Sequence, residues 1–171
     1  NITLRNCWVH GSTAGRGIGL RGVNSVVIDA CRIYDVKWDG IKLDGVGTPT
    51  VKNCEFYGLN DTYSAAIFMW WCTSSVVENN YIHDCYGTNG GITFEECLAG
   101  THYIRNNVIA NNMFVDWQSW HPYGGSALIL RKPTRDGEVA TVNVEHNTMV
   151  NNWGATKSGV TGYAIAWDWN G

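Results

Sequence analysis

The sequence has little proline, no concentrated positive charge and no long apolar run. Proline is rare, with 3 residues against 20 glycines, so we expect many tight turns. The 12 lysines and arginines are scattered and are outnumbered by 15 acidic residues, which argues against nucleic acid or an anionic membrane surface as the main partner. No apolar run approaches the roughly 18 residues of a membrane-spanning helix. We therefore expect neither nucleic-acid binding nor membrane insertion.

The chain does contain enough apolar material for one core and an unusual number of aromatic residues. It has 171 residues, 44% of them hydrophobic, which is typical of a single domain. Among them are 9 tryptophans and 8 tyrosines. Rings in this number predict an adhesive surface.

A strand-turn-strand motif recurs six times. Its copies are "LRNCWV" at Leu4, "IDACRI" at Ile28, "VKNCEF" at Val51, "VENNYI" at Val77, "IRNNVI" at Ile104 and "VEHNTM" at Val144. A second series alternates with it: "GIGLRG" at Gly17, "GIKLDG" at Gly40, "AIFMWW" at Ala66, "GITFEE" at Gly91, "ALILRK" at Ala127 and "AIAWDW" at Ala164. Members of the second series start 23, 26, 25, 36 and 37 residues apart, and such periods are typical of a solenoid. Apolar residues recur at every second position, which is the period of a strand.

Stacking the copies places like residues over like residues, about 4.8 Å apart. The second series predicts an inward column of Ile18, Ile41, Ile67, Ile92, Leu128 and Ile165. The turn of the first series predicts another column, which consists of Cys7, Cys31, Cys54, Asn80, Asn107 and Asn147. Asparagine tolerates left-handed backbone, and its amide can hydrogen-bond neighbours above and below, so we expect a ladder of side-chain amides.

These repeats and the asparagine column resemble the right-handed parallel β-helix family of pectate-lyase-like proteins, over essentially the whole chain. The resemblance implies an all-β, right-handed parallel β-helix of about six coils as one segment, residues 1–171. Stretches 111–126, 132–140 and 151–162 exceed what turns need and are expected to be loops that build a binding face. Neither end looks like a cap. We expect a fragment of a longer helix, its terminal coils covered by further chain segments or another protomer.

The six cysteines leave two alternatives open. Cys7, Cys31 and Cys54 are expected to be small buried thiols in the turn column. Cys72 and Cys97 follow their strands at the same offset, so a disulfide is within reach, although parallel side chains make it awkward. No spacing resembles a structural zinc site.

Residues that alternate with the buried ones in the second series are expected to face solvent on one sheet. One column is Gly19, Lys42, Phe68, Thr93, Ile129 and Ala166, and the next is Arg21, Asp44, Trp70, Glu95, Arg131 and Asp168. A flat face with charges and tryptophans suits a polysaccharide, whose ring faces stack on indoles and whose polar groups need charged partners. The predicted binding residues are Trp70, Trp71, Trp169, Trp120, Tyr123, Lys132 and Asp168. A polysaccharide partner indicates a secreted or cell-surface protein.

In the lyases that the chain resembles, acidic residues of this face hold Ca²⁺ against the uronate carboxylate, and an arginine or lysine takes a proton from the sugar. The resemblance implies two sets of residues. Asp44, Glu95 and Glu96 are the possible acids or Ca²⁺ ligands, and Arg131, Lys132 and Lys42 are the possible bases. Lyase- or epimerase-like action on a uronate polymer is the first alternative.

A glycoside hydrolase is the second alternative. Asp44 and Glu95 are two coils apart, roughly 9.6 Å between backbones, near the wide end of the carboxyl separation in inverting enzymes. "WDGI" at Trp38 resembles the "TDGI" of polygalacturonase-type hydrolases, which carries over Asp39 as a catalytic residue. The next coil reads "SAAI" where that family has paired aspartates, and the family's Gly-His-Gly is missing. His121, in an aromatic segment, is a further candidate acid or base.

The third alternative is a binding role without catalysis, as in a stalk, an adhesin or a fibre. Opposite charges alternate down the second outward column, as they do on a plain solvated sheet. Arg21 precedes Asp44 there, and Arg131 lies between Glu95 and Asp168. An exposed tryptophan among these charges favours a ligand surface instead.

Overall fold

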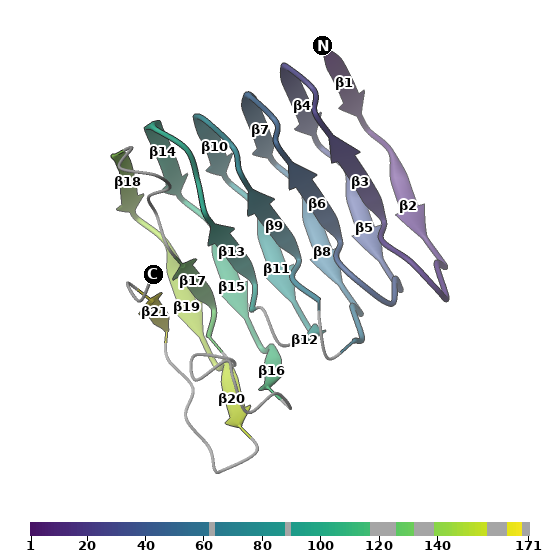
Figure 1. Cartoon of the computed structure of the whole chain (residues 1–171). Helices are drawn as coiled ribbons and strands as arrows, with labels where there is room; N and C mark the ends of the chain where they lie inside the picture. Colours follow the sequence, from purple (N-terminus) through teal and green to yellow (C-terminus); the bar gives the residue numbers. More distant parts are fainter. Residues whose placement is uncertain (62–63, 88–89, 117–125, 132–138, 157–163, 169–171) are drawn as a thin grey trace.

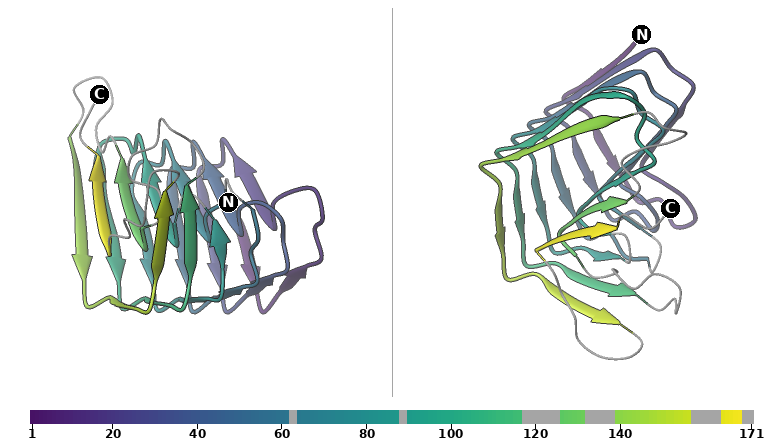
Figure 2. Two further views of the ribbon diagram at one scale, coloured as in Figure 1. Left: turned by 90° about the horizontal axis from the view of Figure 1, so that it is seen from below. Right: turned by 60° about the vertical axis from the view of Figure 1, so that its left-hand side comes forward.

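The computed structural model describes residues 1–61, 64–87, 90–116, 126–131, 139–156 and 164–168. Its regular elements in these ranges are strands, and the chain winds through them as stacked coils (Figure 1). Two further views show the strands of successive coils one behind another (Figure 2). The strand pairs in the described ranges are parallel, as a parallel β-solenoid requires. No helix long and apolar enough to cross a membrane occurs in this part of the chain.

In the described ranges, three sheets of six strands and one sheet of three strands form the walls. Sheet A contains β1 (Ile2–Arg5), β4 (Ser25–Asp29), β7 (Thr48–Lys52), β10 (Ser75–Glu78), β14 (Gly100–Arg105) and β18 (Ala140–Glu145). Sheet B contains β2 (Trp8–His10), β5 (Arg32–Tyr34), β8 (Glu55–Tyr57), β11 (Tyr81–His83), β15 (Val108–Ala110) and β19 (Thr148–Val150). Sheet C contains β3 (Ile18–Arg21), β6 (Ile41–Asp44), β9 (Ile67–Trp70), β13 (Ile92–Glu95), β17 (Leu128–Arg131) and β21 (Ile165–Asp168). Sheet D contains β12 (Tyr86–Gly87), β16 (Met113–Asp116) and β20 (Trp153–Thr156).

The coils stack in the register that the repeat predicts. In sheet C, Ile41 pairs with Ile18 on one side and with Ile67 on the other, and Ile67 pairs with Ile92. Three of these four side chains are fully buried, and Ile18 is 7% exposed. Burying one such side chain contributes about 1.5–3 kcal/mol, so the inward columns supply much of the hydrophobic stabilisation.

The turn from sheet A to sheet B has the same two-residue conformation in the six coils that the structure describes. Its first residue has left-handed backbone, with φ between 53° and 56° at Asn6, Ala30, Asn53, Asn79, Asn106 and His146. Its second residue points inward, and where it is asparagine the amides bond to each other. Asn80 Nδ2 donates to Asn107 Oδ1 at 3.0 Å, and Asn107 Nδ2 donates to Asn147 Oδ1 at 2.9 Å. The predicted amide ladder is confirmed.

Cysteine takes over this inward position in the earlier coils. The backbone N–H of Cys54 donates to Asn80 Oδ1 at 3.0 Å, and that of Cys31 donates to Cys54 Sγ at 3.4 Å. Cys31 and Cys54 are buried, as predicted for small thiols in the column, whereas Cys7 in the first coil is only half-buried. The sulfur therefore continues the ladder with a weaker acceptor than an amide oxygen.

All six cysteines are free thiols, including Cys72 and Cys97, between which a disulfide was one alternative. The turn after sheet C places these two at its inward position. Burial raises the pKa of Cys54, Cys72 and Cys85 to about 12, because a thiolate is poorly solvated in the core. These thiols are therefore protonated packing groups at neutral pH.

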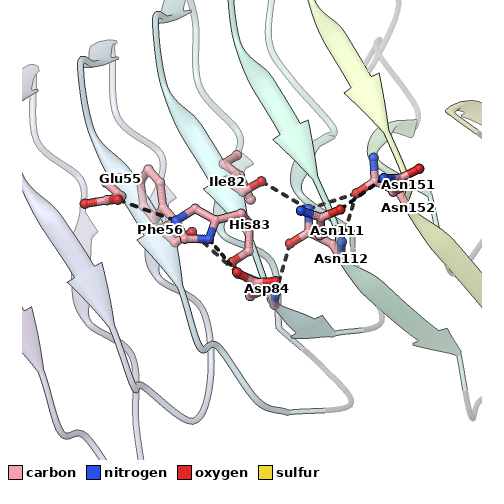
Figure 3. Close-up of polar contacts among 10 residues, drawn as sticks. Glu55, Phe56, Ile82, His83, Asp84, Asn111, Asn112, Asn151 and Asn152 are labelled. Atoms are coloured by element: carbon pink, nitrogen blue, oxygen red, sulfur yellow. Dashed lines mark hydrogen bonds and ion pairs between the residues drawn. The ribbon is translucent and has the colours of Figure 1, made fainter.

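A second ladder, in addition to the predicted one, closes the turn after sheet B. Asn112 Nδ2 donates to Asn152 Oδ1 at 2.9 Å, and the backbone N–H of Cys85 donates to Asn112 Oδ1 at 3.0 Å (Figure 3). Strands β16 and β20 follow these asparagines directly. The coil thus continues as sheet D inside ranges 111–126 and 151–162, which were expected to be loops throughout.

Candidate functional site

The outer face of sheet C is the surface on which the repeat predicts binding residues. Lys42 on β6 is partly exposed there, but Phe68, Thr93, Ile129 and Ala166 on the following strands are only 7%, 1%, 1% and 4% exposed. The prediction that this whole column faces solvent is wrong from β9 onward. Strand alternation decides on which side of a sheet a residue lies, but its burial also depends on what packs over that side.

The second outward column forms ion pairs between neighbouring coils. Arg21 Nε lies 3.3 Å from Asp44 Oδ2, and Arg131 Nη1 lies 3.3 Å from Glu95 Oε1. The side chain of Arg21 is 78% exposed, whereas that of Arg131 is 10% exposed. The structure therefore joins Arg131 and Glu95, predicted as base and acid, to each other in a largely buried pair, and the prediction that Arg131 faces solvent is wrong.

A hollow of about 340 Å³ lies over the first two strands of sheet C. Its described lining residues are Arg16, Gly19, Leu20, Arg21, Lys42 and Asp44. Three of them are cations and one is a carboxylate, so the hollow is suited to an anion. Arg16 and Arg21 were not among the predicted site residues, although both occur in "GRGIGLRG", one just before strand β3 and one at its end. We call this surface the cationic hollow.

Lys42 connects the cationic hollow to the tryptophans. Its Nζ lies 4.5 Å from the ring centroid of Phe68 and 4.9 Å from that of Trp70. Aromatic faces attract an ammonium group, so these contacts fix the position of the charge. Trp70 and Trp71, both predicted as binding residues, lie with ring centroids 4.5 Å apart and are partly exposed.

The three carboxylates predicted as Ca²⁺ ligands have three different sets of partners. Asp44 and Glu95 each face an arginine of a neighbouring coil. Glu96 Oε2 accepts hydrogen bonds from the indole N–H groups of Trp71 at 2.6 Å and Trp70 at 3.3 Å. No group of three or more His, Cys, Asp or Glu side chains in the described ranges is arranged to hold a metal ion. These carboxylates therefore do not fit one shared Ca²⁺ site.

Asp39 lies just before β6 and is 3% exposed. Its Oδ2 accepts a hydrogen bond from Arg16 Nε at 2.8 Å, and its Oδ1 accepts one from the Ala65 N–H at 3.1 Å. Burial raises the pKa of Asp39, and the Arg16 guanidinium partly offsets that rise. A second hollow, of about 480 Å³, is lined by Arg16, Trp38, Asp39 and Asp61 among the described residues. Asp61, which was not predicted, adds a second carboxylate there.

Five predicted site residues lie outside the described residues: His121, Trp120, Tyr123, Lys132 and Trp169. Asp168 belongs to β21, where its backbone pairs with that of Arg131. The roles assigned to these six residues stay predictions.

A polar network on the outer face of sheet B surrounds His83 (Figure 3). Its Nδ1 lies 2.8 Å from Asp84 Oδ2, and its Nε2 lies 3.5 Å from Glu55 Oε1. The imidazole also stacks on Tyr57 and Tyr81, with ring centroids 5.3 Å and 4.1 Å away. The imidazole is thus packed among two carboxylates and two aromatic rings, which favours a packing role over catalysis.

Parallel coils in register, internal amide ladders and an outer face with charges and aromatic rings define a parallel β-solenoid with a candidate ligand surface. Residues 1–132 match the family described as the right-handed β-helix region. The chain therefore belongs to the right-handed β-helix family, as the repeats predict. No curated protein and no solved structure matches it. A fold shared by many activities does not assign one, so the function must be argued from the site.

Proposed function

We propose that this protein binds an acidic polysaccharide, a uronate polymer, along the outer face of sheet C. The observation that carries the proposal is the cationic hollow, in which Arg16, Arg21 and Lys42 stand with one described carboxylate, Asp44. Each uronate residue carries a carboxylate, and guanidinium groups bind carboxylates through paired N–H donors. Arg21 is mostly exposed and can offer such donors to a ligand.

Lyase- or epimerase-like action is the chemistry we favour. A base removes the proton next to the sugar carboxylate. In the lyase reaction the electron pair then forms a C=C bond as the C–O bond to the glycosidic oxygen breaks, and that oxygen takes up a proton from solvent water. Lys42 is the best-placed described base, because Arg131 is largely buried against Glu95. Since the ring contacts of Lys42 favour an ammonium group, binding has stronger support than proton abstraction.

Hydrolysis is the second candidate, and the second hollow supports it. Asp39 and Asp61 both line that hollow, and the raised pKa of Asp39 suits a general acid. Its hydrogen bonds to Arg16 and Ala65 oppose this role, because they hold the carboxylate as an acceptor. A hydrolase generates reducing ends without an unsaturated product, so the product distinguishes the two chemistries.

Affinity electrophoresis against acidic and neutral polysaccharides tests the binding proposal. We expect Arg21→Ala to weaken binding of the acidic polymer by about tenfold, the loss of one charged contact. Arg32→Ala is the matched control, because Arg32 is a 52% exposed arginine that pairs with Glu55 at 2.9 Å on sheet B. Equal affinity of both variants and the wild type would remove the cationic hollow from the proposal.

Product assays then decide between an enzyme and a binding module. A lyase generates an unsaturated sugar that absorbs near-ultraviolet light, and Lys42→Met should abolish that signal. Binding without any product assigns a non-catalytic role to the same surface. Chelation tests for Ca²⁺, for which Asp44, Glu95 and Glu96 do not form one shared site. Secretion stays a prediction, which a polysaccharide partner outside the cell implies.

A further inference from the structure

The turn after sheet C contains two bulky residues where the fold uses glycine in earlier coils. This turn has left-handed backbone at Gly22, Gly45, Trp71 and Glu96, with φ of 64°, 61°, 55° and 47°. A side chain with a Cβ is strained in that conformation, whereas glycine is not. The turn therefore does not need an indole or a carboxylate in order to close, and both are held there at a conformational cost.

The two strained residues bond to each other across neighbouring coils. Glu96 Oε2 accepts the Trp71 N–H at 2.6 Å and the Trp70 N–H at 3.3 Å, so one carboxylate oxygen holds two indoles. The two rings lie 4.5 Å apart with planes inclined by 35°. Because both N–H groups are already bonded to Glu96, a ligand meets the ring surfaces of these partly exposed indoles.

We infer that Trp70 and Trp71, positioned by Glu96, form a stacking subsite for a pyranose ring of the polysaccharide. The subsite is continuous with the cationic hollow, since Lys42 lies 4.9 Å from the Trp70 ring and also lines the hollow. Trp70 also pairs in register with Asp44, another residue of the hollow. The inference rests on the proposed function: one sugar stacks on the indoles while the carboxylate of a neighbouring sugar reaches the arginines. Trp71 and Trp70 contact the ligand, and Glu96 is a positioning residue.

Trp71→Gly separates a functional role from a structural one. Glycine relieves the left-handed strain, so we expect the thermal midpoint to stay unchanged or to rise, while the Kd for the polysaccharide rises about tenfold. Trp71→Asn, which also tolerates this backbone, is the second variant in case the glycine chain folds poorly. Trp8→Ala is the matched control, because Trp8 is 67% exposed on sheet B, away from the subsite.

Glu96 is tested by a readout that reports indole geometry. Glu96→Ala should weaken the near-ultraviolet circular dichroism signal of the indole pair and raise the Kd several-fold, because the rings lose their shared acceptor. Glu96→Gln keeps an amide oxygen at the same position and should restore much of both. A spectrum unchanged in Glu96→Ala, together with unchanged affinity, removes the positioning role.

The outcomes separate this inference from the proposed function. Wild-type affinity in both Trp71 variants overturns the subsite but leaves the cationic hollow intact. Binding of neutral polysaccharide alone, lost in Trp71→Gly, overturns the uronate proposal and keeps the subsite. A wild-type protein that binds no polysaccharide overturns both. A large fall in thermal midpoint with Trp71→Gly assigns the indole to packing.

Discussion

Two arginine–carboxylate pairs on sheet C hold their guanidinium groups in opposite surroundings. Arg21 faces Asp44 and Arg131 faces Glu95, and both closest N to O distances are 3.3 Å. The first arginine is 78% exposed and the second is 10% exposed. The carboxylates differ much less, at 13% exposure for Asp44 and 23% for Glu95. An exposed guanidinium can exchange its partner for a ligand at little cost in stability, whereas a buried one is costly to leave unpaired. Burial of the guanidinium, and not residue type or spacing, therefore separates the proposed binding end from the structural end.

The largest expected effect concerns the buried thiols. They test quantitatively whether burial, and not residue type, determines how a group behaves. With the pKa of Cys54 at about 12 against an ordinary 9.0, its thiolate fraction near pH 8 falls by about a thousandfold on folding. We expect iodoacetamide to label Cys54 at least a thousandfold more slowly in the native protein than in urea, measured by mass spectrometry. Comparable labelling rates in both states would mean that burial does not control the reactivity of these thiols.

Alkaline pH extends that test to stability. The folded pKa of Cys54, Cys72 and Cys85 is raised above the unfolded value, so their contribution is complete below about pH 9 and is lost as pH rises from 9 toward 12. We expect the urea midpoint to fall steadily across this window. Cys54→Ala should reduce the slope, and a midpoint independent of pH would contradict the assignment.

Removal of the carboxylate from each pair compares the two ends directly. Glu95→Ala leaves a largely buried guanidinium without this carboxylate and should cost about 2 kcal/mol of unfolding free energy. Asp44→Ala leaves Arg21 in water and should change that free energy by less than about 1 kcal/mol. Urea unfolding followed by circular dichroism measures both. Equal costs would show that exposure does not separate the pairs.

Salt should have the smallest effect, and only at the binding end. The Debye length falls from about 10 Å at 0.1 M to about 3 Å at 1 M ionic strength, and this screening weakens interactions of exposed charges most. We expect several-fold weaker binding of the acidic polymer over this range. The difference in stability between wild type and Glu95→Ala should stay nearly constant, and an equal response of both quantities contradicts the comparison.

Much of the fold could be predicted, because parallel stacking in register needs only equal spacing of alike residues. Ile41, Ile67 and Ile92 pair as the repeat requires, and the ladder at Asn80 and Asn107 forms at the predicted turn. The second ladder was missed although its signal was present. Asn-Asn pairs at 111–112 and 151–152 match those at 79–80 and 106–107.

The site was less predictable, because exposure depends on tertiary packing. The periodicity placed Arg131 and Glu95 correctly on the outer side of sheet C, yet nothing in their spacing distinguishes them from Arg21 and Asp44. The hydrogen bonds from two indoles to Glu96 could not be predicted either. It arises from left-handed backbone at Trp71 and Glu96, a conformation that neither residue type predicts.

The amide ladder joins neighbouring coils asymmetrically, because one coil supplies the backbone donor and the next coil supplies the side-chain acceptor. The turn N–H of Cys54 is bonded by the side chain of Asn80, and the turn N–H of Asn80 by that of Asn107. In each of these coils, the buried turn N–H donates to the side chain of the next coil, so the ladder has a direction along the solenoid axis. Removing a coil from the C-terminal side breaks the bond to the turn N–H of the coil beneath, and the same type of bond is broken at each of these steps. Unwinding along the axis is therefore resisted one amide at a time.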